Sequence, residues 1–169
     1  MKVLTVLVPT YNVEKYLRRC LDSLLLPEVL EEIEVLVVND GSKDGSADIA
    51  RAYEKKYPQT VVFVDKENGG HGSTINVGIE KAQGTYFKVL DSDDWVNIGD
   101  FIEFVKRLKE ETADAVICDY RKEHVYNGKS EYFEYKDLED GKKYNLNEID
   151  LNILHGEYFM LSLIHISEP

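Results

Sequence analysis

The chain reads Tyr86-Phe87-Lys88-Val89-Leu90-Asp91-Ser92-Asp93-Asp94 near its middle, so a short apolar run passes directly into three carboxylates within four residues. Like charges this close raise one another's pKa and destabilise a fold unless a cation or hydrogen-bond donors offset them. Mg²⁺ and Mn²⁺ favour such oxygen ligands, with substrate phosphates completing the coordination. The alternative is a polar turn capping a helix that starts near Asn97, since Asp and Ser favour caps.

The same kind of apolar run recurs along the chain and predicts buried strands, because runs rich in Val, Ile and Leu are typical of strands covered on both faces. The predicted strands are residues 3–8, 33–38, 61–64, 86–90 and 115–118. Helical spacing of apolar residues fills the intervals, over residues 13–24, 49–57, 75–82 and 101–108. The alternation predicts an α/β fold with a mostly parallel, doubly wound sheet and right-handed crossovers.

Two predicted helices carry recognisable start signals. Asn12 is the predicted N-cap of the first helix, and Asp44 or Ser46 that of the second.

Composition limits the class of protein. With 169 residues and 43% hydrophobic content, the chain can form one globular domain with a substantial core. A net charge of −12 and a pI near 4.8 argue against nucleic-acid binding, which needs a basic surface. There is no apolar window of about 18 residues, so no transmembrane helix is expected. Cys20 and Cys118 lack metal-type spacing and are predicted to be free buried thiols in a reducing cytosol.

The polar residues gather where the predicted strands end. They form clusters at residues 9–12, 39–46, 66–72 and 91–94. In open α/β sheets, ligands bind outside the carboxyl ends of the strands, near the point where the strand order reverses. Each cluster alone could be a turn, but the four together predict a binding site on one edge of the sheet.

Four motifs in this order resemble those of the family 2 glycosyltransferases, which are nucleotide-sugar enzymes of the GT-A fold. The motifs are Val8-Pro9-Thr10-Tyr11-Asn12, Val38-Asn39-Asp40-Gly41-Ser42-Lys43-Asp44-Gly45-Ser46, Asn68-Gly69-Gly70 and Leu90-Asp91-Ser92-Asp93-Asp94. The resemblance covers about residues 1–120. It implies transfer of a sugar from a nucleotide donor, expected to be a UDP-sugar, to an acceptor hydroxyl with inversion at the anomeric carbon. It also implies a divalent metal, Mg²⁺ or Mn²⁺.

The resemblance also implies a set of donor-binding residues. These are Pro9, Thr10, Tyr11, Glu14, Asp40, Lys66, Asp91 and Ser92. Thr10 and Tyr11 would line the base pocket, with an aromatic ring against the nucleobase. Asp40 would accept the imide N–H of uracil; its alternative role is a cap within its own turn.

The carboxylates after the fourth strand would hold the diphosphate end of the donor. Asp93 would coordinate the metal, and Asp91 would be a metal ligand through a bound water or would meet the ribose hydroxyls. Asp94 would support the loop. The metal would neutralise charge on the departing nucleoside diphosphate.

The remaining candidates keep two interpretations each. Glu14 suits either a donor site or the dipole of a helix N-terminus. Lys66 could reach a phosphate or base, or be an ordinary surface lysine. His71 is interpreted as a solvated loop histidine, and Trp95 as wall or core rather than a sugar platform.

The chain divides into a donor-binding core, residues 1–120, and the start of an acceptor-side region, residues 121–160. Residues 121–135 predict a β-hairpin around Asn127-Gly128, and a short helix is expected from Leu146. Residues 161–169 look like the in-frame translation of a sequencing adapter, to be excluded from fold reasoning; the alternative is an amphipathic tail. The catalytic base that inversion requires is not identified in these regions.

Two other functional classes stay open. The first is a catalytically incomplete nucleotide-binding fragment that lacks the general base. The second is a dinucleotide-dependent oxidoreductase, disfavoured because Pro9-Thr10-Tyr11-Asn12 replaces the Gly-x-Gly-x-x-Gly turn. The expected partners are a nucleotide-sugar donor and a glycan or lipid-linked acceptor. The expected setting is cytoplasmic polysaccharide biosynthesis, and work at the inner membrane face would fit the family.

Overall fold

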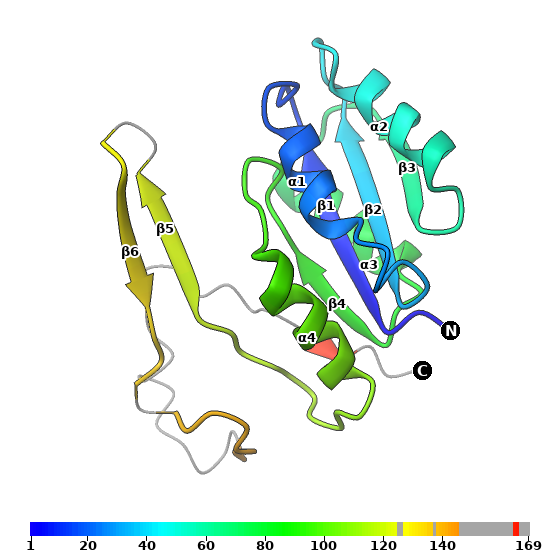
Figure 1. Cartoon of the computed structure of the whole chain (residues 1–169). Coiled ribbons are helices and arrows are strands. Elements are labelled where there is room, and N and C mark those ends of the chain that lie inside the picture. Colours follow the sequence, from blue (N-terminus) through cyan, green and yellow to red (C-terminus); the bar gives the residue numbers. More distant parts are fainter. Residues whose placement is uncertain (125–126, 137, 146–163, 166–169) are drawn as a thin grey trace.

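A parallel sheet forms the centre of the molecule (Figure 1). The computed structural model describes residues 1–124, 127–136, 138–145 and 164–165. The parallel strands are β1 (Leu4–Thr10), β2 (Ile33–Asp40), β3 (Val61–Lys66) and β4 (Tyr86–Val89). They lie in the order β3-β2-β1-β4, and the two-residue strand β7 (Ile164–His165) pairs antiparallel with β4. The prediction of a mostly parallel α/β sheet is confirmed.

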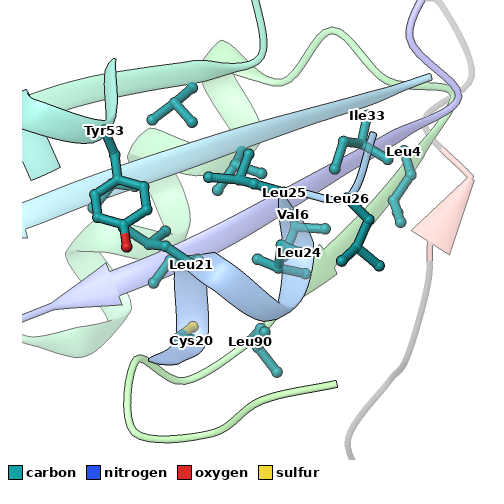
Figure 2. Close-up of a cluster of buried hydrophobic side chains, with 14 of the residues drawn as sticks. Leu4, Val6, Cys20, Leu21, Leu24, Leu25, Leu26, Ile33, Tyr53 and Leu90 are labelled. Carbon is teal, nitrogen blue, oxygen red and sulfur yellow. The ribbon is translucent and has the colours of Figure 1, made fainter. Parts of the chain in front are cut away.

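Helices cover both faces of this sheet. They are α1 (Leu17–Leu24), α2 (Ser46–Lys56), α3 (His71–Lys81) and α4 (Ile98–Leu108). Helices α1, α2 and α4 pack on the face formed by residues such as Leu4, Val6 and Ile33, whereas α3 packs on the face that contains Leu7 and Phe87. Figure 2 shows the first of these clusters, where α1 lies across β1 and β2. Burying each Val or Leu side chain of this kind contributes about 1.5–3 kcal/mol.

The strand order creates a crevice at one edge. The chain passes from β1 to β2 and β3 in one direction, then crosses to β4 on the opposite side of β1. Where the connections from two neighbouring strands run in opposite directions, the loops at the carboxyl ends of those strands move apart and leave a space between them. Open α/β sheets bind ligands in this space. Here that point lies between the ends of β1 and β4.

A small antiparallel hairpin stands beside the sheet, next to the segment that follows β4 (Figure 1). Its strands are β5 (Tyr120–His124) and β6 (Lys129–Phe133). Gly128 has a φ of 65° in the connecting turn, a conformation that glycine adopts without steric cost. Tyr120 stacks on Phe133 with ring centroids 4.8 Å apart. The predicted hairpin is therefore confirmed.

Four local predictions are wrong, and one of them is the N-cap of α2, which is Gly45 rather than Asp44 or Ser46. Residues 115–118 form no strand and make only an isolated bridge at Ala115, since tertiary context decides whether so short an apolar run pairs as a strand. Helix α1 begins at Leu17 rather than near residue 13. Asn12 is not its N-cap, because Asn12 lies in the left-handed region with a φ of 54° and its side chain bonds elsewhere.

Some predictions concern residues that the structure describes only in part. The helix expected from Leu146 and residues 161–163 and 166–169 lie outside the described residues. In the described part of the chain, none of the helices has both the length and the apolar character needed to cross a membrane. Of the two cysteines predicted to be buried, Cys20 is fully buried and Cys118 is only partly buried.

Candidate active site

A cleft of about 470 Å³ opens at the carboxyl edge of the sheet. The loops after all four parallel strands contribute to its walls. Its lining residues are Pro9, Thr10, Tyr11, Val13, Asp40, Asn68, Gly70, His71, Thr74, Asp91, Ser92 and Asp93. The four polar clusters that the sequence placed at strand ends therefore meet in one cavity.

Most of the predicted donor-binding residues line this cleft. They are Pro9, Thr10, Tyr11, Asp40, Asp91 and Ser92, and Asp93, the predicted metal ligand, lines it too. Tyr11 is half exposed at the cleft, which suits an aromatic surface for a planar ligand. Glu14 and Lys66 are not among the lining residues; both bond to other parts of the protein.

Asp40 is the buried carboxylate of the cleft, with only 3% of the residue exposed. Its Oδ1 accepts hydrogen bonds from Lys66 Nζ and from the backbone N–H of Gly69, and its Oδ2 accepts one from the N–H of Gly70. Burial alone would raise the pKa of Asp40, but these donors outweigh it and hold the pKa below its usual value. Asp40 is therefore an anion, and it ties β2 to the Gly69-Gly70 loop instead of capping its own turn.

Lys66 supports the cleft from behind Asp40. Its ammonium group also donates to the Glu67 carbonyl at 2.6 Å and to Ser73 Oγ at 2.9 Å. An ammonium has three protons, so these two acceptors and Asp40 use its full donor capacity. Lys66 is thus neither a solvated surface lysine nor available to a phosphate in this arrangement.

Glu14 takes part in a different structure, a set of hydrogen bonds that joins the loop after β1 to the loop after β2. Glu14 Oε2 accepts from the N–H of Gly45 at 2.7 Å, and the Glu14 N–H donates to Asp44 Oδ2 at 3.0 Å. The carboxylate thus lies at the N-terminus of α2, since Gly45 is the N-cap of that helix. One interpretation expected Glu14 to interact with the dipole of a helix N-terminus. It does so, but the helix is α2 rather than α1.

Further bonds complete this connection between the loops. Asn12 Oδ1 accepts from the N–H of Lys43 at 2.7 Å, the Asn12 N–H donates to Ser42 Oγ at 3.1 Å, and the Val13 N–H donates to Ser46 Oγ at 2.9 Å. The residues between positions 12 and 46 that resembled a ligand-binding motif therefore serve in part to position Thr10, Tyr11 and Asp40.

The turn Asp91-Ser92-Asp93-Asp94 closes with a hydrogen bond from the Asp94 N–H to the Asp91 carbonyl at 2.9 Å. It does not cap α4. Asn97 performs that function, because its Oδ1 accepts from the N–H groups of Gly99 and Asp100. Of the two interpretations given to the turn, helix capping is wrong.

Concentrated negative charge is evident around this turn. Loss of surrounding water, followed by the charges of Asp93 and Asp91, raises the pKa of Asp94. Burial, followed by the charges of Asp94, Asp93 and Asp91, raises the pKa of the Cys20 thiol to about 12. Both shifts have the sign expected when burial and the gathered anions act together, and for Asp94 they outweigh the opposing charge of Lys88.

Helix α1 holds this turn in place. Cys20 Sγ lies 3.8 Å from the Asp91 carbonyl oxygen, and Ser23 Oγ accepts a hydrogen bond from the Val96 N–H at 3.2 Å. The two contacts fix the start and the end of the acidic segment against one helix.

The donor set suits a divalent metal that keeps part of its water. In the described residues, no group of three or more His, Cys, Asp and Glu side chains converges on a point that could hold a metal ion. Asp91 and Asp93 instead present carboxylates to the cleft. Mg²⁺ is commonly held by one or two carboxylates together with waters and substrate phosphates, so the residues fit an ion that binds with the donor.

His71 is a cleft residue that sequence reasoning assigned to solvent. It is the first residue of α3, and its Nε2 lies 4.0 Å from Asp91 Oδ1 across the cleft. The only sequence signal for this placement is the Asn68-Gly69-Gly70 motif before it, since the loop had to lie on the same edge as the acidic turn.

Comparisons with known proteins agree with this architecture. The family model "Glycosyl transferase family 2" matches residues 5–164. The putative glycosyltransferase EpsH of Bacillus subtilis is 41% identical over 126 residues, which are 75% of this chain and 36% of EpsH.

Solved structures show the same fold. A crystal structure of S. aureus TarS residues 1–349 in complex with UDP-GlcNAc has a TM-score of 0.58 and 33% identity, over 68% of this chain and 33% of that TarS fragment. The mannosyltransferase PcManGT of Pyrobaculum calidifontis, in complex with GDP-Man and Mn²⁺, has a TM-score of 0.59 and 26% identity, over 73% of this chain and 36% of that protein. The chain thus spans about a third of the length of these proteins. With its GT-A sheet and its match to the family model, it belongs to glycosyltransferase family 2.

Proposed function

We propose that this protein binds a nucleotide sugar, with UDP as the nucleotide, and transfers the sugar to an acceptor hydroxyl with inversion. One observation carries the proposal: Tyr11, Asp40 and Asp93, which follow three different strands, line the same cleft at the point where the strand order reverses. That arrangement can take a base at one end and a diphosphate at the other. The complexes of TarS with UDP-GlcNAc and of PcManGT with GDP-Man and Mn²⁺ support it.

Asp40 would select the base. Three protein donors fix its two oxygens, yet a carboxylate has about four lone-pair sites. The remaining site would accept the imide N–H of uracil, and the lowered pKa of Asp40 keeps it an acceptor throughout the neutral range. Tyr11, beside it in the cleft lining, would pack its ring on the base.

Asp91 and Asp93 would hold Mg²⁺ or Mn²⁺ at the diphosphate. When bound, the ion supplies charge neutralisation for the departing nucleoside diphosphate. The two carboxylates would orient the donor, and Ser92 lies buried between them in the turn.

The proposal is tested by calorimetry with UDP in the presence and absence of Mn²⁺. Binding should require the metal, and Asp93→Asn should weaken it by at least about tenfold, since a charged ligand is lost. Asp48→Asn is the matched control because it removes a carboxylate on the exposed surface of α2. UDP binding that is equally tight without metal, or in Asp93→Asn, would contradict the metal assignment.

A second candidate function is nucleotide binding without transfer. The carboxylates that line the described cleft are Asp40, Asp91 and Asp93, and all three are assigned to the donor, which leaves the base for acceptor deprotonation unassigned. Incubation of this chain with UDP-sugars, Mn²⁺ and an acceptor panel distinguishes the two. UDP release that depends on acceptor supports transfer, and UDP binding without acceptor-dependent release supports the binding unit.

A further inference from the structure

A second cavity adjoins the acidic turn. It has a volume of about 400 Å³ and is lined by Arg19, Trp95, Glu123, His124 and Gly128. The segment 91–95 therefore contributes to the donor cleft with its first residues and to this cavity with its last. The hairpin β5–β6 provides the facing wall, and Figure 1 shows it beside the segment that follows β4.

Arg19 and Trp95 stack on each other in the wall of this cavity. The Arg19 guanidinium carbon lies 3.2 Å from the centroid of the Trp95 ring. Stacking against the indole holds the guanidinium in one position, and the N–H groups, which lie in the guanidinium plane, can still bond to another group. Within the described part of the chain, Arg19 makes no hydrogen bond and no ion pair, so these donors are not used by the protein.

The acidic residues around the cavity already have partners on the hairpin. Glu123 Oε1 accepts a hydrogen bond from Ser130 Oγ at 2.8 Å and lies 3.8 Å from Arg121 Nη1. Glu131 Oε1 lies 3.2 Å from His124 Nε2, close enough to pair with a protonated ring although the angle makes no hydrogen bond.

Arg19 is therefore an uncompensated positive charge in a chain whose net charge is −12. A fixed guanidinium with unused donors binds phosphate oxygens in a bidentate manner, and such charge-assisted bonds are roughly twice as strong as neutral ones. The chemistry of the cavity therefore favours a phosphate group over a neutral hydroxyl compound.

We propose that this cavity is an acceptor subsite and that it binds a polyol or sugar acceptor through a phosphate group held by Arg19. This inference rests on the proposed function, because an acceptor subsite presupposes that the protein transfers a sugar. In an inverting displacement the acceptor hydroxyl attacks from the side opposite the leaving diphosphate, so the acceptor must lie next to the donor cleft and outside it. The cavity behind the acidic turn meets that requirement, because residues 91–95 border both spaces.

Trp95 makes the proposal directly measurable, because it is the only tryptophan in the chain. The whole chain is titrated with glycerol 1-phosphate at constant ionic strength while tryptophan fluorescence is recorded, with glycerol as the neutral comparison. Glycerol 1-phosphate should produce a saturable change and glycerol none. Arg19→Gln should weaken the affinity for glycerol 1-phosphate by about 10-fold or more. Arg19→Lys should have an intermediate effect, because lysine keeps the positive charge but lacks the planar, two-pronged donor geometry of the guanidinium.

Arg18→Gln is the matched control, since it removes the same charge from the exposed neighbouring position on α1 and should leave the titration unchanged. Equal responses to glycerol and glycerol 1-phosphate, or a phosphate titration that survives Arg19→Gln, would overturn the proposal. Vesicles of phosphatidylglycerol identify the source of the phosphate. Arg19-dependent sedimentation with vesicles indicates a lipid-linked acceptor, whereas its absence with retained glycerol 1-phosphate binding indicates a soluble one.

The proposed function is separated from this inference by calorimetry with UDP and Mn²⁺ on the same variants. Arg19→Gln should bind UDP like the unmodified chain, and Asp93→Asn should retain glycerol 1-phosphate binding. Failure of UDP to bind the unmodified chain, together with a normal phosphate titration, would refute the proposed function and leave the phosphate site intact.

Discussion

Lys66 Nζ and Asp40 Oδ1 are joined by a hydrogen-bonded ion pair beside the cleft at the carboxyl edge of the sheet. The Asp40 side chain is only 4% exposed, whereas that of Lys66 is 21% exposed. A buried carboxylate depends on such a partner, because removal of one member of a buried pair leaves an uncompensated charge. Lys66 therefore stabilises the negative charge of Asp40 in the wall of the cleft, although Lys66 itself does not line the cleft.

Replacing Lys66 by methionine should destabilise the protein. We expect the free energy of unfolding to fall by about 2–4 kcal/mol at pH 7, since Asp40 keeps only its backbone donors. Urea denaturation measures this. The double variant Asp40→Asn with Lys66→Met should lose less than Lys66→Met alone, because no charge is then stranded; an equal or larger loss would contradict this explanation.

The contribution of this pair should also depend on pH. The pKa of Asp40 is lowered in the folded state, so the stabilisation is fully present above its unfolded pKa of about 3.9 and is lost as the pH falls through the lowered folded value. The difference in unfolding free energy between the unmodified chain and Lys66→Met should be constant from pH 7 to pH 5 and shrink below about pH 4. A difference that changes between pH 7 and pH 5 would point to another group.

The hydrogen bonds between the first two loops should contribute unequally. Ser46 is fully buried and accepts from the Val13 N–H, so Ser46→Ala should cost about 1–2 kcal/mol of unfolding free energy. Ser42 accepts from the Asn12 N–H in an exposed position, where water can replace it. Ser42→Ala is thus the control, with an expected loss below about 0.5 kcal/mol. Equal losses in thermal or urea unfolding would show that burial does not decide the effect.

Gly84 allows β1 to approach the end of the segment after α3. A Cβ atom there would overlap the Thr5 backbone nitrogen, so the backbone would have to move. Gly84→Ala should destabilise the protein by about 2–3 kcal/mol. Gly72, in the first turn of α3, has no atom within 4 Å of the added carbon, and Gly72→Ala should instead stabilise by about 0.5–1 kcal/mol. Differential scanning calorimetry should show Tm shifts of opposite sign.

Lys88 lies in β4 and has no hydrogen bond or ion pair within the described part of the chain. Burial lowers its pKa, against the smaller opposing effects of Cys118 and Asp94. The unfolded chain therefore binds this proton more tightly, and stability should rise with pH between the lowered pKa and about 10.4.

Lys88→Met removes the free-energy cost of burying the charged ammonium group. It should stabilise the protein at pH 7 by about 1–2 kcal/mol and abolish the rise in stability towards alkaline pH. Lys106→Met, on the exposed surface of α4, is the control and should change neither quantity. An unchanged pH slope in Lys88→Met would show that Lys88 is not the titrating group.

Much of the architecture follows from local patterns in the sequence. The strands β1 to β4 and the helices between them correspond to apolar runs and helical spacing, because burial of a strand or of one helix face imposes a period on neighbouring residues. The edge of the sheet that carries the site also follows from the sequence, because polar residues come directly after each apolar run. The strand expected at residues 115–118 fails because a run of this length forms a strand only when another strand pairs with it.

The roles of individual polar residues depended on tertiary structure. Glu14, Asn12 and Lys66 look like ligand-binding residues in the sequence, and the fold uses them to bond one loop to another. Their type and position are the same in either role. Which role they take depends on how far the neighbouring loop lies from them.

By itself, therefore, the sequence determined the alternation of elements, the parallel sheet and the grouping of Thr10, Asp40 and Asp91 at one edge, because these follow from hydrophobic period and chain order. Only the tertiary structure decided that Lys66 serves Asp40 and that Arg19 lies on Trp95. Such partners are distant in the sequence, and the distances between their side chains are set by the packing of whole elements rather than by any local pattern.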